Sequence, residues 1–485
     1  MSAPDNILKI NIPDIATKQL QLQNCSAGRK LVISTNWLPL FGFETGCSVR
    51  EISLGKNKGL KIVLEAQNSA NLCSDMPKPK KVYSRAYKVR KNNPLETMLD
   101  IRSQKLLNEV FPEDTQKVHI LFKFGEIIIT PITNRQSQAI SDFKHNKTNK
   151  FSTFLACSSG VDAVSLKKTG FEIETLLEFR PHEKRDKNDL SETGALNALA
   201  NIGVKHLINE DIMALDIDKI AKLTQASKHT LFHISTQCDD FSNVKASSLK
   251  ECSLEDGSTS IDMIIDALDL IKKFNFPTIL HENVRGFESS DAGRIFKARL
   301  KRLGYRVYDG LFDAREHGGN TGRVRHYLFA TQLPSKFSLP QPVTEKPQQA
   351  SSNIWERYIE PRILSGELRD VTDLKTTQDG IATGRARLIK RDSSYSPTFL
   401  KSQNRQAKDS VFVYDEIRDK YYFPSNSLMA ELMGIPDVCF DAVSSMIEGE
   451  IIGQSIEAPL HEALLEAVRT HIQEAAIVVT GKLCY

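Results

Sequence analysis

The chain has 485 residues, more than one compact core holds, so we expect two or three domains. Hydrophobic residues make up 40% of it and charged residues 26%, which is typical of a soluble globular protein, and no apolar run is long enough to span a membrane. A net charge of +4 is too small to indicate nucleic-acid binding by itself. The eight cysteines form no CxxC pair and lack metal-ligand spacing, so we expect free thiols in a reducing cytosol and no metal site. The N-terminus has no basic segment leading into an apolar core, so we do not expect export.

Residues 1–145 contain a pattern that occurs twice. In each copy a short element precedes two strands that flank a glycine-containing turn: 37–43, 49–52 and 60–64 in the first, and 106–112, 118–122 and 126–131 in the second. A duplicated hairpin unit predicts a small β-rich barrel or sandwich, with the Pro- and Lys-rich stretch 76–94 as the linker. The first copy resembles the swapped-hairpin DNA-binding domains of transition-state regulators and related toxins, so DNA binding by this domain is a hypothesis.

Two local clusters of basic residues contain aromatic side chains. The first comprises Lys78, Lys80, Lys81, Arg85, Lys88, Arg90 and Lys91, with Tyr83 and Tyr87 among them. The second comprises Arg385, Arg387, Lys390, Arg391, Lys401 and Arg405, with Tyr395 and Phe399 among them. Cations bind phosphates and aromatic rings stack on bases, so both clusters are candidate nucleic-acid surfaces. Either cluster is equally compatible with a solvated loop.

From about residue 150 the sequence alternates β-prone runs with amphipathic segments. The predicted strands are 153–156, 174–179, 206–209, 230–235, 278–281, 305–311 and 326–331. A helix face is predicted from Ile261 to Ile271, with Ser260 as its N-cap. This alternation predicts an α/β fold with a doubly wound, mostly parallel sheet.

The alternation of predicted strands and helices stops at residue 335, and apolar patterning resumes near residue 421. Pro, Gln, Ser and Thr are frequent between these positions, so we expect 335–420 to be an irregular inserted domain. Residues 421–485 regain apolar patterning and are expected to complete the domain that begins with 150–334.

A cysteine follows the predicted strand at 230–235. Cys238 lies where an apolar run gives way to a polar loop, and ligands of open α/β sheets bind at that edge. A partly exposed thiol among positive neighbours forms the nucleophilic thiolate. A packed core cysteine is the alternative interpretation, because free cysteine is among the most buried residue types.

Polar residues also follow several other predicted strands. Ser158 and Gly160 lie in a small-residue turn after the first strand, and Glu178 and Asp211 follow the next two. Carboxylates at such positions accept hydrogen bonds from ribose hydroxyls or an adenine amino group. Glu282 ends another apolar strand, where a carboxyl group has a raised pKa and carries a proton near neutral pH.

Two arginines begin the last predicted strand. Arg323 and Arg325 alternate along it, so they share one face. Paired guanidinium groups suit a phosphate or a pyrimidine carbonyl, and they lower the pKa of a nearby thiol.

Taken in order, these positions resemble the motifs of the C5-cytosine DNA methyltransferases, across residues 150–475. That family's glycine-rich turn falls on 154–161, its ribose-binding acid on Glu178 and its Asp-Ile pair on 211–212. Its Pro-Cys-Gln-x-Phe-Ser motif falls on 237–242, Glu-Asn-Val is intact at 282–284, and Gln-x-Arg-x-Arg falls on 321–325. The closing motifs resemble 432–436 and 452–456.

The chain departs from the family pattern mainly around the cofactor turn and the loop. Ser158 and Val161 replace glycines, and Gln237 replaces the proline before the nucleophile. Further replacements are Asp239, Thr321 and Gln454. The cysteine, the Glu-Asn-Val motif and both arginines are retained, which favours an active but divergent member.

The resemblance implies a sequence-specific DNA (cytosine-5)-methyltransferase with a Rossmann-like catalytic domain and S-adenosylmethionine as methyl donor. Cys238 would attack C6 of a cytosine flipped out of the duplex, and loop 239–258 would close behind it. Glu282 would hydrogen-bond the ring, while Arg323 and Arg325 would hold its O2 side or the neighbouring phosphate. The implied cofactor residues are Ser158, Gly160, Glu178, Phe179, Asp211, Ile212, Gln237 and Gln454.

The resemblance also implies the partner. Residues 335–420 would be the target recognition domain, and the expected DNA contacts are Ser242, Arg385, Arg387, Lys390, Arg391 and Lys401. We expect a monomer on double-stranded DNA, in the cytoplasm of a prokaryote or encoded by a phage, and associated with the nucleoid.

Three alternatives remain open at this point. An RNA cytosine methyltransferase would share the fold, although a recognition region of this size and a separate N-terminal domain favour DNA. A non-catalytic DNA-binding regulator would fit the altered cofactor turn but not the retained cysteine, glutamate and arginines. The unusual turn would also permit a modified methyl donor with a larger group.

Overall fold

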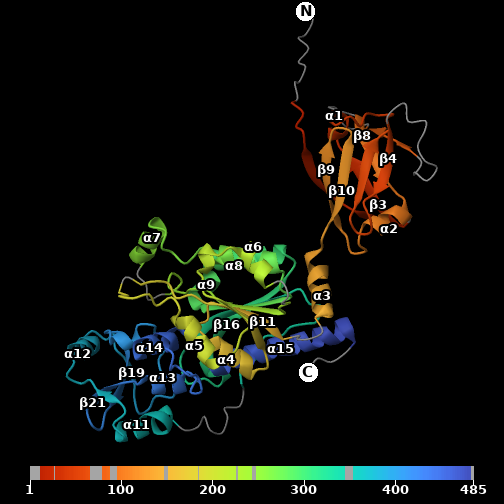
Figure 1. Ribbon diagram of the computed structural model, residues 1–485. Helices are drawn as coiled ribbons and strands as arrows, with labels where there is room; N and C mark the ends of the chain where they lie inside the picture. The colour runs from red at the N-terminus through yellow and green to blue at the C-terminus, as the bar shows by residue number, and fades with distance from the viewer. Residues whose placement is uncertain are drawn as a thin grey trace, which may run out of the picture. The chain divides into compact units, whose positions relative to one another are not determined.

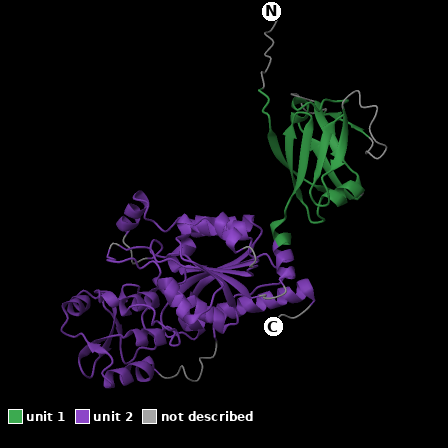
Figure 2. Ribbon diagram, in the orientation of Figure 1, with its two compact units in different colours: residues 1–138 green, residues 139–485 purple. Residues whose placement is uncertain are grey.

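The computed structural model describes residues 11–26, 28–65, 79–87, 95–146, 151–183, 185–224, 228–242, 247–343 and 353–481. The chain forms two compact units, residues 1–138 and residues 139–485 (Figure 2). No helix among the described residues combines the length and the hydropathy that a bilayer-spanning segment needs. The six cysteines in the described ranges are free thiols, and Cys73 and Cys484 lie outside those ranges.

The first unit consists of two antiparallel sheets (Figure 1). The six-stranded sheet has the order β1-β9-β10-β5-β4-β6 and the four-stranded sheet the order β2-β3-β8-β7. The strands are β1 (Ala16–Gln21), β2 (Gln23–Cys25), β3 (Gly28–Ser34), β4 (Ser48–Ser53), β5 (Leu60–Leu64), β6 (Lys80–Lys81), β7 (Tyr83–Ala86), β8 (Leu95–Ile101), β9 (Lys117–Lys123) and β10 (Glu126–Ile132). Two short helices accompany them, α1 (Trp37–Leu40) and α2 (Gln104–Val110).

Two series of elements in this unit have the same order, strand-helix-strand-strand. The series β3-α1-β4-β5 corresponds to β8-α2-β9-β10, and the copies meet through the antiparallel pairs β3–β8 and β5–β10. Alternate residues of β9 face the interior, where Val118, Ile120 and Phe122 are fully buried. The predicted linker at 76–94 is not wholly irregular, because it contains β6 and β7. Of the first basic cluster, Lys78, Lys88, Arg90 and Lys91 lie outside the described residues.

The second unit is built on a seven-stranded sheet with the order β13-β12-β11-β14-β15-β17-β16. Neighbours from β13 to β15 are parallel, and β17 is antiparallel to both β15 and β16. The strands are β11 (Ser152–Ala156), β12 (Glu172–Leu177), β13 (His206–Ile208), β14 (Leu231–Ser235), β15 (Thr278–Val284), β16 (Arg306–Asp313) and β17 (Val324–Thr331). All seven predicted strands are present, and β15 extends to include Glu282.

Helices cover both faces of this sheet, as Figure 1 shows. One hydrophobic cluster joins the sheet to α4 (Val161–Lys168), α5 (Thr193–Asn201) and α15 (Ala458–Thr480), and another joins it to α6 (Ile217–Leu223), α8 (Met263–Phe274) and α10 (Asp291–Arg302). The predicted helix is therefore α8, but its N-cap is Asp262. Ser260 was the wrong choice because its backbone N–H and hydroxyl are bonded to Asp240. The remaining elements here are α3 (Arg135–His145), η1 (Ile212–Ala214), α7 (Ser247–Glu255), α9 (Arg285–Ser289) and η2 (Ala314–His317).

The segment 335–420, expected to be irregular, contributes three strands to a second, smaller sheet, and the fourth strand begins at residue 420. Its order is β18-β21-β20-β19, formed by β18 (Arg369–Asp370), β19 (Arg387–Ile389), β20 (Val411–Asp415) and β21 (Lys420–Phe423). The accompanying helices are η4 (Trp355–Ile359), α11 (Glu360–Leu364), α12 (Lys375–Ala382) and η5 (Gln403–Arg405). A shared core packs this region against α13 (Asn426–Leu432) and α14 (Ser445–Gln454).

The turn between β11 and α4 has an unusual backbone. Cys157, Ser159 and Gly160 have φ of 57°, 51° and 86°. All three thus adopt the left-handed conformation, which residues other than glycine rarely adopt. A Cβ atom at Gly160 would lie 2.6 Å from the Cα of Ala198. Only glycine fits at the start of α4, because α5 packs directly against its backbone.

Gly160→Ala should therefore destabilise the protein. Overpacking against α5 and the positive φ together predict a loss of about 2–4 kcal/mol in the free energy of unfolding. Gly203→Ala is the matched control, because a Cβ there meets no atom within 4 Å, and its effect should stay within about 1 kcal/mol. Urea denaturation of both variants measures the difference, and equal midpoints would contradict the packing argument.

Candidate active site

A cavity of about 420 Å³ lies at the carboxyl edge of the seven-stranded sheet. Its size is within the range of about 300–1,000 Å³ that small-molecule sites occupy, and its position is where open α/β sheets bind ligands. Ten of the twelve predicted catalytic and cofactor-binding residues line it: Ser158, Glu178, Phe179, Asp211, Ile212, Gln237, Cys238, Glu282, Arg325 and Gln454. The strand ends thus bring together residues that are up to 296 positions apart in the chain, from Ser158 to Gln454.

Glu178 anchors one end of this cavity. Its Oε2 accepts hydrogen bonds from the backbone N–H groups of Ser158 and Ser159 at 2.8 and 2.9 Å, so β12 holds the strained turn in place. Burial raises the pKa of Glu178 to about 7, against the opposing effect of those two N–H groups. The second oxygen of Glu178, Oε1, lies against Gly194 of α5, where a Cβ atom would be only 2.7 Å away. Because Gly194 has no side chain, Oε1 has space at the cavity.

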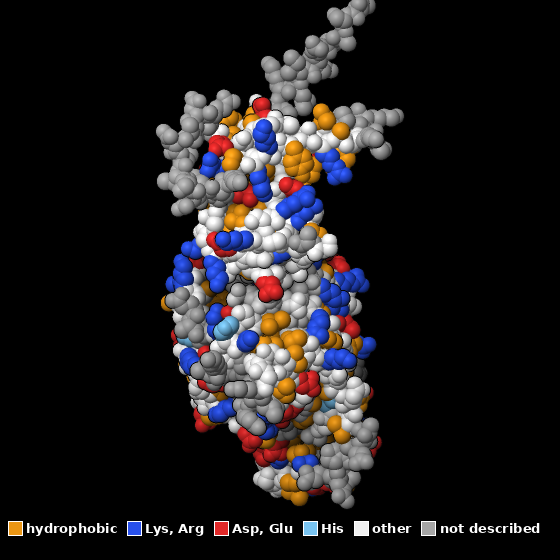
Figure 3. Space-filling model, turned by 90° about the vertical axis from the view of Figure 1, so that its right-hand side faces the viewer, with side chains coloured by type: hydrophobic (Ala, Val, Ile, Leu, Met, Phe, Trp, Pro, Cys, Tyr) orange, Lys and Arg blue, Asp and Glu red, His pale blue; other side chains and the backbone are white. Residues whose placement is uncertain are grey.

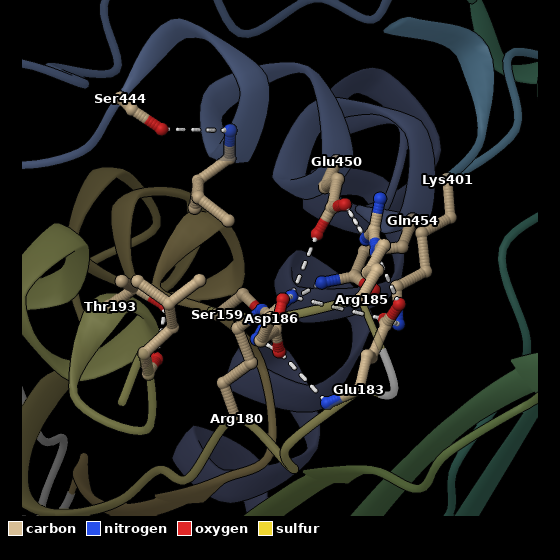
Figure 4. A network of polar contacts seen from close by, with 12 residues as sticks. Ser159, Arg180, Glu183, Arg185, Asp186, Thr193, Lys401, Ser444, Glu450 and Gln454 are labelled. Atoms are coloured by element: carbon tan, nitrogen blue, oxygen red, sulfur yellow. Dashed lines mark hydrogen bonds and ion pairs between the residues drawn. The ribbon is translucent and has the colours of Figure 1, made fainter. Parts of the chain in front are cut away.

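Three further residues complete this end. Asp211 caps η1 by accepting the backbone N–H of Met213 at 3.0 Å, which places its carboxylate and Ile212 at the cavity wall. Gln454 on α14 donates to the hydroxyl of Ser159 at 3.1 Å (Figure 4). Gly160 itself does not line the cavity, and its contribution is to let α5 approach the turn.

Cys238 lies at the other end, half-buried in the loop after β14. Burial raises the pKa of its thiol, and Asp239 raises it further, whereas the guanidinium of Arg325 opposes both. The carbonyl oxygen of Cys238 accepts the N–H groups of Phe241 and Ser242 at 3.1 and 2.9 Å, which folds the loop into a tight turn. The sulfur is thus held at the cavity and is not enclosed in packed hydrocarbon.

Hydrogen bonds fix the start of this loop, where Gln237 stands in place of a proline. Asn283 Nδ2 donates to the carbonyl oxygen and the hydroxyl of Thr236, at 2.9 and 2.8 Å. The same hydroxyl lies 2.9 Å from Nε2 of His281. Because β14 and β15 are adjacent parallel strands, this side-chain bracing supplies rigidity that a proline would otherwise provide.

Glu282 and Arg325 face each other across the β15–β17 pair. Arg325 Nε lies 3.1 Å from Glu282 Oε1, and both side chains are largely buried. Burial raises the pKa of Glu282, and Arg325 opposes that rise. The pair therefore offers a buried carboxyl group beside a guanidinium, next to the thiol of Cys238.

Arg323 is placed differently from the sequence interpretation. It is fully buried and does not line the cavity, and its Nη1 donates to the carbonyl oxygens of Phe399 and Gly453, both at 3.2 Å. Burial lowers its pKa to about 9, as does the neighbouring Arg325. Arg323 thus joins β17 to the inserted region and to α14.

The residues predicted to contact DNA do not form one surface cluster. Arg387 donates to the carbonyl oxygens of Asp409 and Thr398, and Arg391 pairs with Glu360 at 2.9 Å, so both are engaged within the fold. Their role as DNA contacts stays a prediction. Arg385 is exposed, Lys390 is half-buried, and Ser242 ends the tight turn after Cys238, so for these three the DNA-contact interpretation stays a prediction.

An ion-pair network that the sequence did not predict forms part of the cavity wall (Figure 4). Arg180 pairs with Asp186 at 2.6 Å and with Glu450 of α14 at 3.4 Å. Lys401, predicted to contact DNA, lines the cavity and pairs with Glu183 at 2.8 Å. The charged run 180–186 is indistinguishable from a solvated loop in the sequence, because its partners Lys401 and Glu450 are more than 200 residues away.

The arrangement combines three chemical functions in one cavity. A thiol, a carboxyl group with a raised pKa and a guanidinium suit nucleophilic addition to a planar polar ring, with a proton held opposite the attacking sulfur. Glu178 and Asp211 at the other end present carboxylate oxygens to a ligand that carries hydroxyl and amino groups.

Comparisons with known proteins identify the family that this sequence resembles. A family model described as C-5 cytosine-specific DNA methylase matches residues 188–469. The Type II methyltransferase M1.ScrFI of Lactococcus lactis subsp. cremoris is 26% identical over 209 residues, covering 41% of this chain and 52% of that protein. The Type II methyltransferase M.NlaX of Neisseria lactamica is 25% identical over 200 residues, covering 39% of this chain and 62% of that protein. The chain thus spans between half and two thirds of the length of these curated relatives.

Solved structures also resemble this chain. The S. pombe Dnmt2 methyltransferase has a TM-score of 0.49 and 16% identity, over 65% of this chain and 97% of that one. The Entamoeba histolytica methyltransferase EhMeth has a TM-score of 0.48 and 14% identity, over 66% of this chain and 99% of that one.

Replacing Arg325 should make Cys238 less reactive. Arg325→Met removes the guanidinium that lowers the pKa of the thiol, so alkylation of Cys238 by iodoacetamide near pH 8 should slow by about 3–10-fold. The rate should recover as the pH rises, because the thiolate forms at higher pH. Peptide mass spectrometry follows the reaction, with the exposed Cys252 as the internal control thiol. Identical pH profiles for both proteins would contradict this electrostatic role.

Proposed function

The chain belongs to the C-5 cytosine-specific DNA methylase family, and we propose that it methylates C5 of cytosine within a specific sequence of duplex DNA, with S-adenosylmethionine as donor. The observation that supports this proposal best is the shared cavity. Cys238, Glu282 and Arg325 line one end of it and Glu178 and Asp211 the other, so a nucleophile and a nucleoside-binding pair of acids open into the same space.

The residues at the Glu178 end fit the donor. Oε2 of Glu178 is occupied by backbone N–H groups while Oε1 remains for a ribose hydroxyl, and Asp211 suits an adenine amino group. Phe179 and Ile212 would enclose the base, with Ser158, Gln237 and Gln454 around the remainder of the molecule. S-adenosylmethionine supplies the electrophilic methyl group when it is bound.

At the other end, the chemistry begins with the thiol. Cytosine C5 is too weak a nucleophile by itself, so the Cys238 thiolate adds to C6 and the ring electrons move to C5, which takes the methyl group. Glu282 holds a proton toward N3 and offsets the negative charge that develops on the ring. The positive charge of Arg325 favours the thiolate form of Cys238, and its guanidinium would face O2 of the cytosine ring. Loss of the C5 proton to a base or water then expels Cys238 and restores the double bond.

Arg323 serves as a positioning residue in this proposal. Its two carbonyl partners belong to the inserted region and to α14, so it ties β17, which carries Arg325, to the region we propose to recognise DNA. The target base lies inside a duplex and must be flipped out to reach Cys238. Arg385 and Lys390 are the proposed DNA contacts of the inserted region.

Sequencing of DNA from expressing cells tests the proposal directly. After bisulfite treatment, 5-methylcytosine should occur in one recurring sequence context in cells that express the native chain. Cys238→Ser should lower methylation by at least about 10⁴-fold, because the hydroxyl is a far weaker nucleophile. Persistent methylation in that variant would remove Cys238 from the role, and an unmethylated genome with the native chain would refute the activity.

Donor binding should depend on the charge of Glu178. Its pKa is raised to about 7, so the carboxylate becomes populated between pH 6 and pH 8, and affinity for S-adenosylmethionine should rise over that interval. Glu178→Gln should weaken binding about 10–100-fold at pH 8 and remove the pH dependence, because one charge-assisted hydrogen bond is lost. Isothermal titration calorimetry measures both. Glu172→Gln, exposed at the opposite end of β12, should behave like the native chain.

The N-terminal unit is proposed to bind duplex DNA without sequence preference. Lys81 and Arg85 are exposed on β6 and β7, next to the exposed ring of Tyr83, and the guanidinium of Arg85 lies 5.1 Å from the ring centre of Tyr87. Cations beside aromatic rings suit phosphates and bases. The face of the molecule in Figure 3 carries Lys and Arg interspersed with Asp and Glu, so we expect a weak, salt-sensitive contact.

Reversing these two charges tests that contact. Lys81→Glu with Arg85→Glu should weaken binding to a duplex without target sites about 10-fold at low salt, and reduce the salt slope by about 2. Lys105→Glu with Lys117→Glu makes the same change in net charge at other exposed positions, and it should have a smaller effect. Fluorescence anisotropy at several salt concentrations measures the DNA affinity of both double variants. Equal losses of affinity in the two would exclude a local contact at Lys81 and Arg85.

A further inference from the structure

Three buried side chains that the proposed reaction does not use meet beneath the cavity. Asp162 lies in the first turn of α4, His233 in β14 and His461 in α15. Each is 2% exposed or less, and one potential ligand atom from each lies within 4.8 Å of the other two. Residues separated by up to 299 positions thus present two imidazoles and one carboxylate to a common point.

Hydrogen bonds hold both imidazoles of the cluster in place. His233 Nδ1 lies 3.1 Å from the carbonyl oxygen of Leu280, which only accepts, so Nδ1 carries a proton and Nε2 faces Asp162 Oδ2 at 2.8 Å. His461 Nδ1 lies 3.2 Å from the hydroxyl of Tyr327. A metal-bound histidine usually uses its second nitrogen in this way, since that bond fixes the ring and its tautomer.

One buried atom in the cluster has no partner. Within the residues that the structure describes, Nε2 of His461 makes no hydrogen bond, although it is enclosed by protein. An ion pair between Asp162 and His233 satisfies those two side chains but leaves this nitrogen unpaired. A cation between the three donors satisfies all of them, which makes it the better account of the cluster.

The donor set indicates which cation. Two imidazole nitrogens and one carboxylate oxygen suit zinc and similar divalent transition metals and not magnesium or calcium, which prefer oxygen ligands. Tetrahedral bonds of about 2.0–2.2 Å hold ligand atoms about 3.3–3.6 Å apart. His233 Nε2 and Asp162 Oδ2, now 2.8 Å apart, would therefore separate slightly when the ion binds. Asp162 and Ser235 both line the large cavity, and the hydroxyl of Ser235 donates to Asp162 Oδ2 at 2.9 Å, so an ion and a fourth ligand can reach the site from that side.

We propose that Asp162, His233 and His461 bind a divalent transition-metal ion, with zinc as the preferred one, that clamps α15 and β14 to the first turn of α4. The ion would secure the helix that follows the strained turn at 157–160, in a part of the chain where sequence spacing alone predicted no metal site. The site shares no ligand with the proposed methyl transfer, because Asp162, His233 and His461 have no role in the steps proposed for it.

Zinc titration of the full chain, after treatment with a chelator and gel filtration, tests the site. Calorimetry and elemental analysis should give one tightly bound zinc per chain. His461→Asn keeps a partner for Tyr327 but removes the Nε2 ligand, and it should weaken zinc binding by at least about 100-fold. Cys252→Ser and His145→Asn, at an exposed thiol and an exposed imidazole, should leave the stoichiometry and affinity unchanged.

Thermal unfolding provides a second readout that does not depend on activity. Zinc should raise the unfolding midpoint of the native chain, because it binds only the folded state, and should not raise that of His461→Asn. If His461→Asn does not fold, Asp162→Asn replaces it in the zinc titration and the unfolding measurement. Its amide keeps contacts to His233 and Ser235 but removes the negative charge that a zinc ligand needs. Zinc binding of equal strength in the native chain and the folded variant, or no stoichiometric zinc in the native chain, would overturn the proposal.

Discussion

The active site depends on the register in which β14, β15 and β17 pair. Parallel pairing places Ser235 opposite Glu282, so the Cys238 loop starts beside that carboxyl group. Antiparallel pairing places Val284 opposite Arg325, which brings the guanidinium within 3.1 Å of Glu282. A slip of one residue in either pair would turn these side chains to the opposite face of the sheet. The single antiparallel strand is therefore what allows an arginine to enter the edge where the parallel strands end.

Burial sets the electrostatics of both ends of the cavity. Desolvation raises the pKa of Glu178 and of Glu282, and in each case nearby groups oppose the rise, backbone N–H groups for the first and Arg325 for the second. Burial similarly raises the pKa of Cys238 while Arg325 opposes it. At all three groups burial thus favours the uncharged form, and neighbouring donors or cations favour the charged form.

The sequence predicted the elements better than the distant contacts. Strands and their polar ends follow from local apolar runs, which is why Glu178, Cys238 and Glu282 were found. The internal partners of Arg387 and Arg391, Asp409 and Glu360, could not be foreseen, because a count of local charge says nothing about contacts between distant residues. Asp162, His233 and His461 escaped notice for the same reason, since a lone histidine or aspartate in an apolar run gives no sign of what it will meet. The small sheet within 335–420 was missed because its strands are as short as two residues.

The last helix has a consequence for how the protein is made. Leu464, Leu465 and Val468 of α15 belong to the same hydrophobic cluster as Leu155 of β11, although some 300 residues separate them. A ribosome must therefore deliver nearly the entire second unit before that core can close, whereas the strands of the first unit all pair within residues 16–132. Nascent chains consequently carry a finished amino-terminal unit well before they carry a finished second unit.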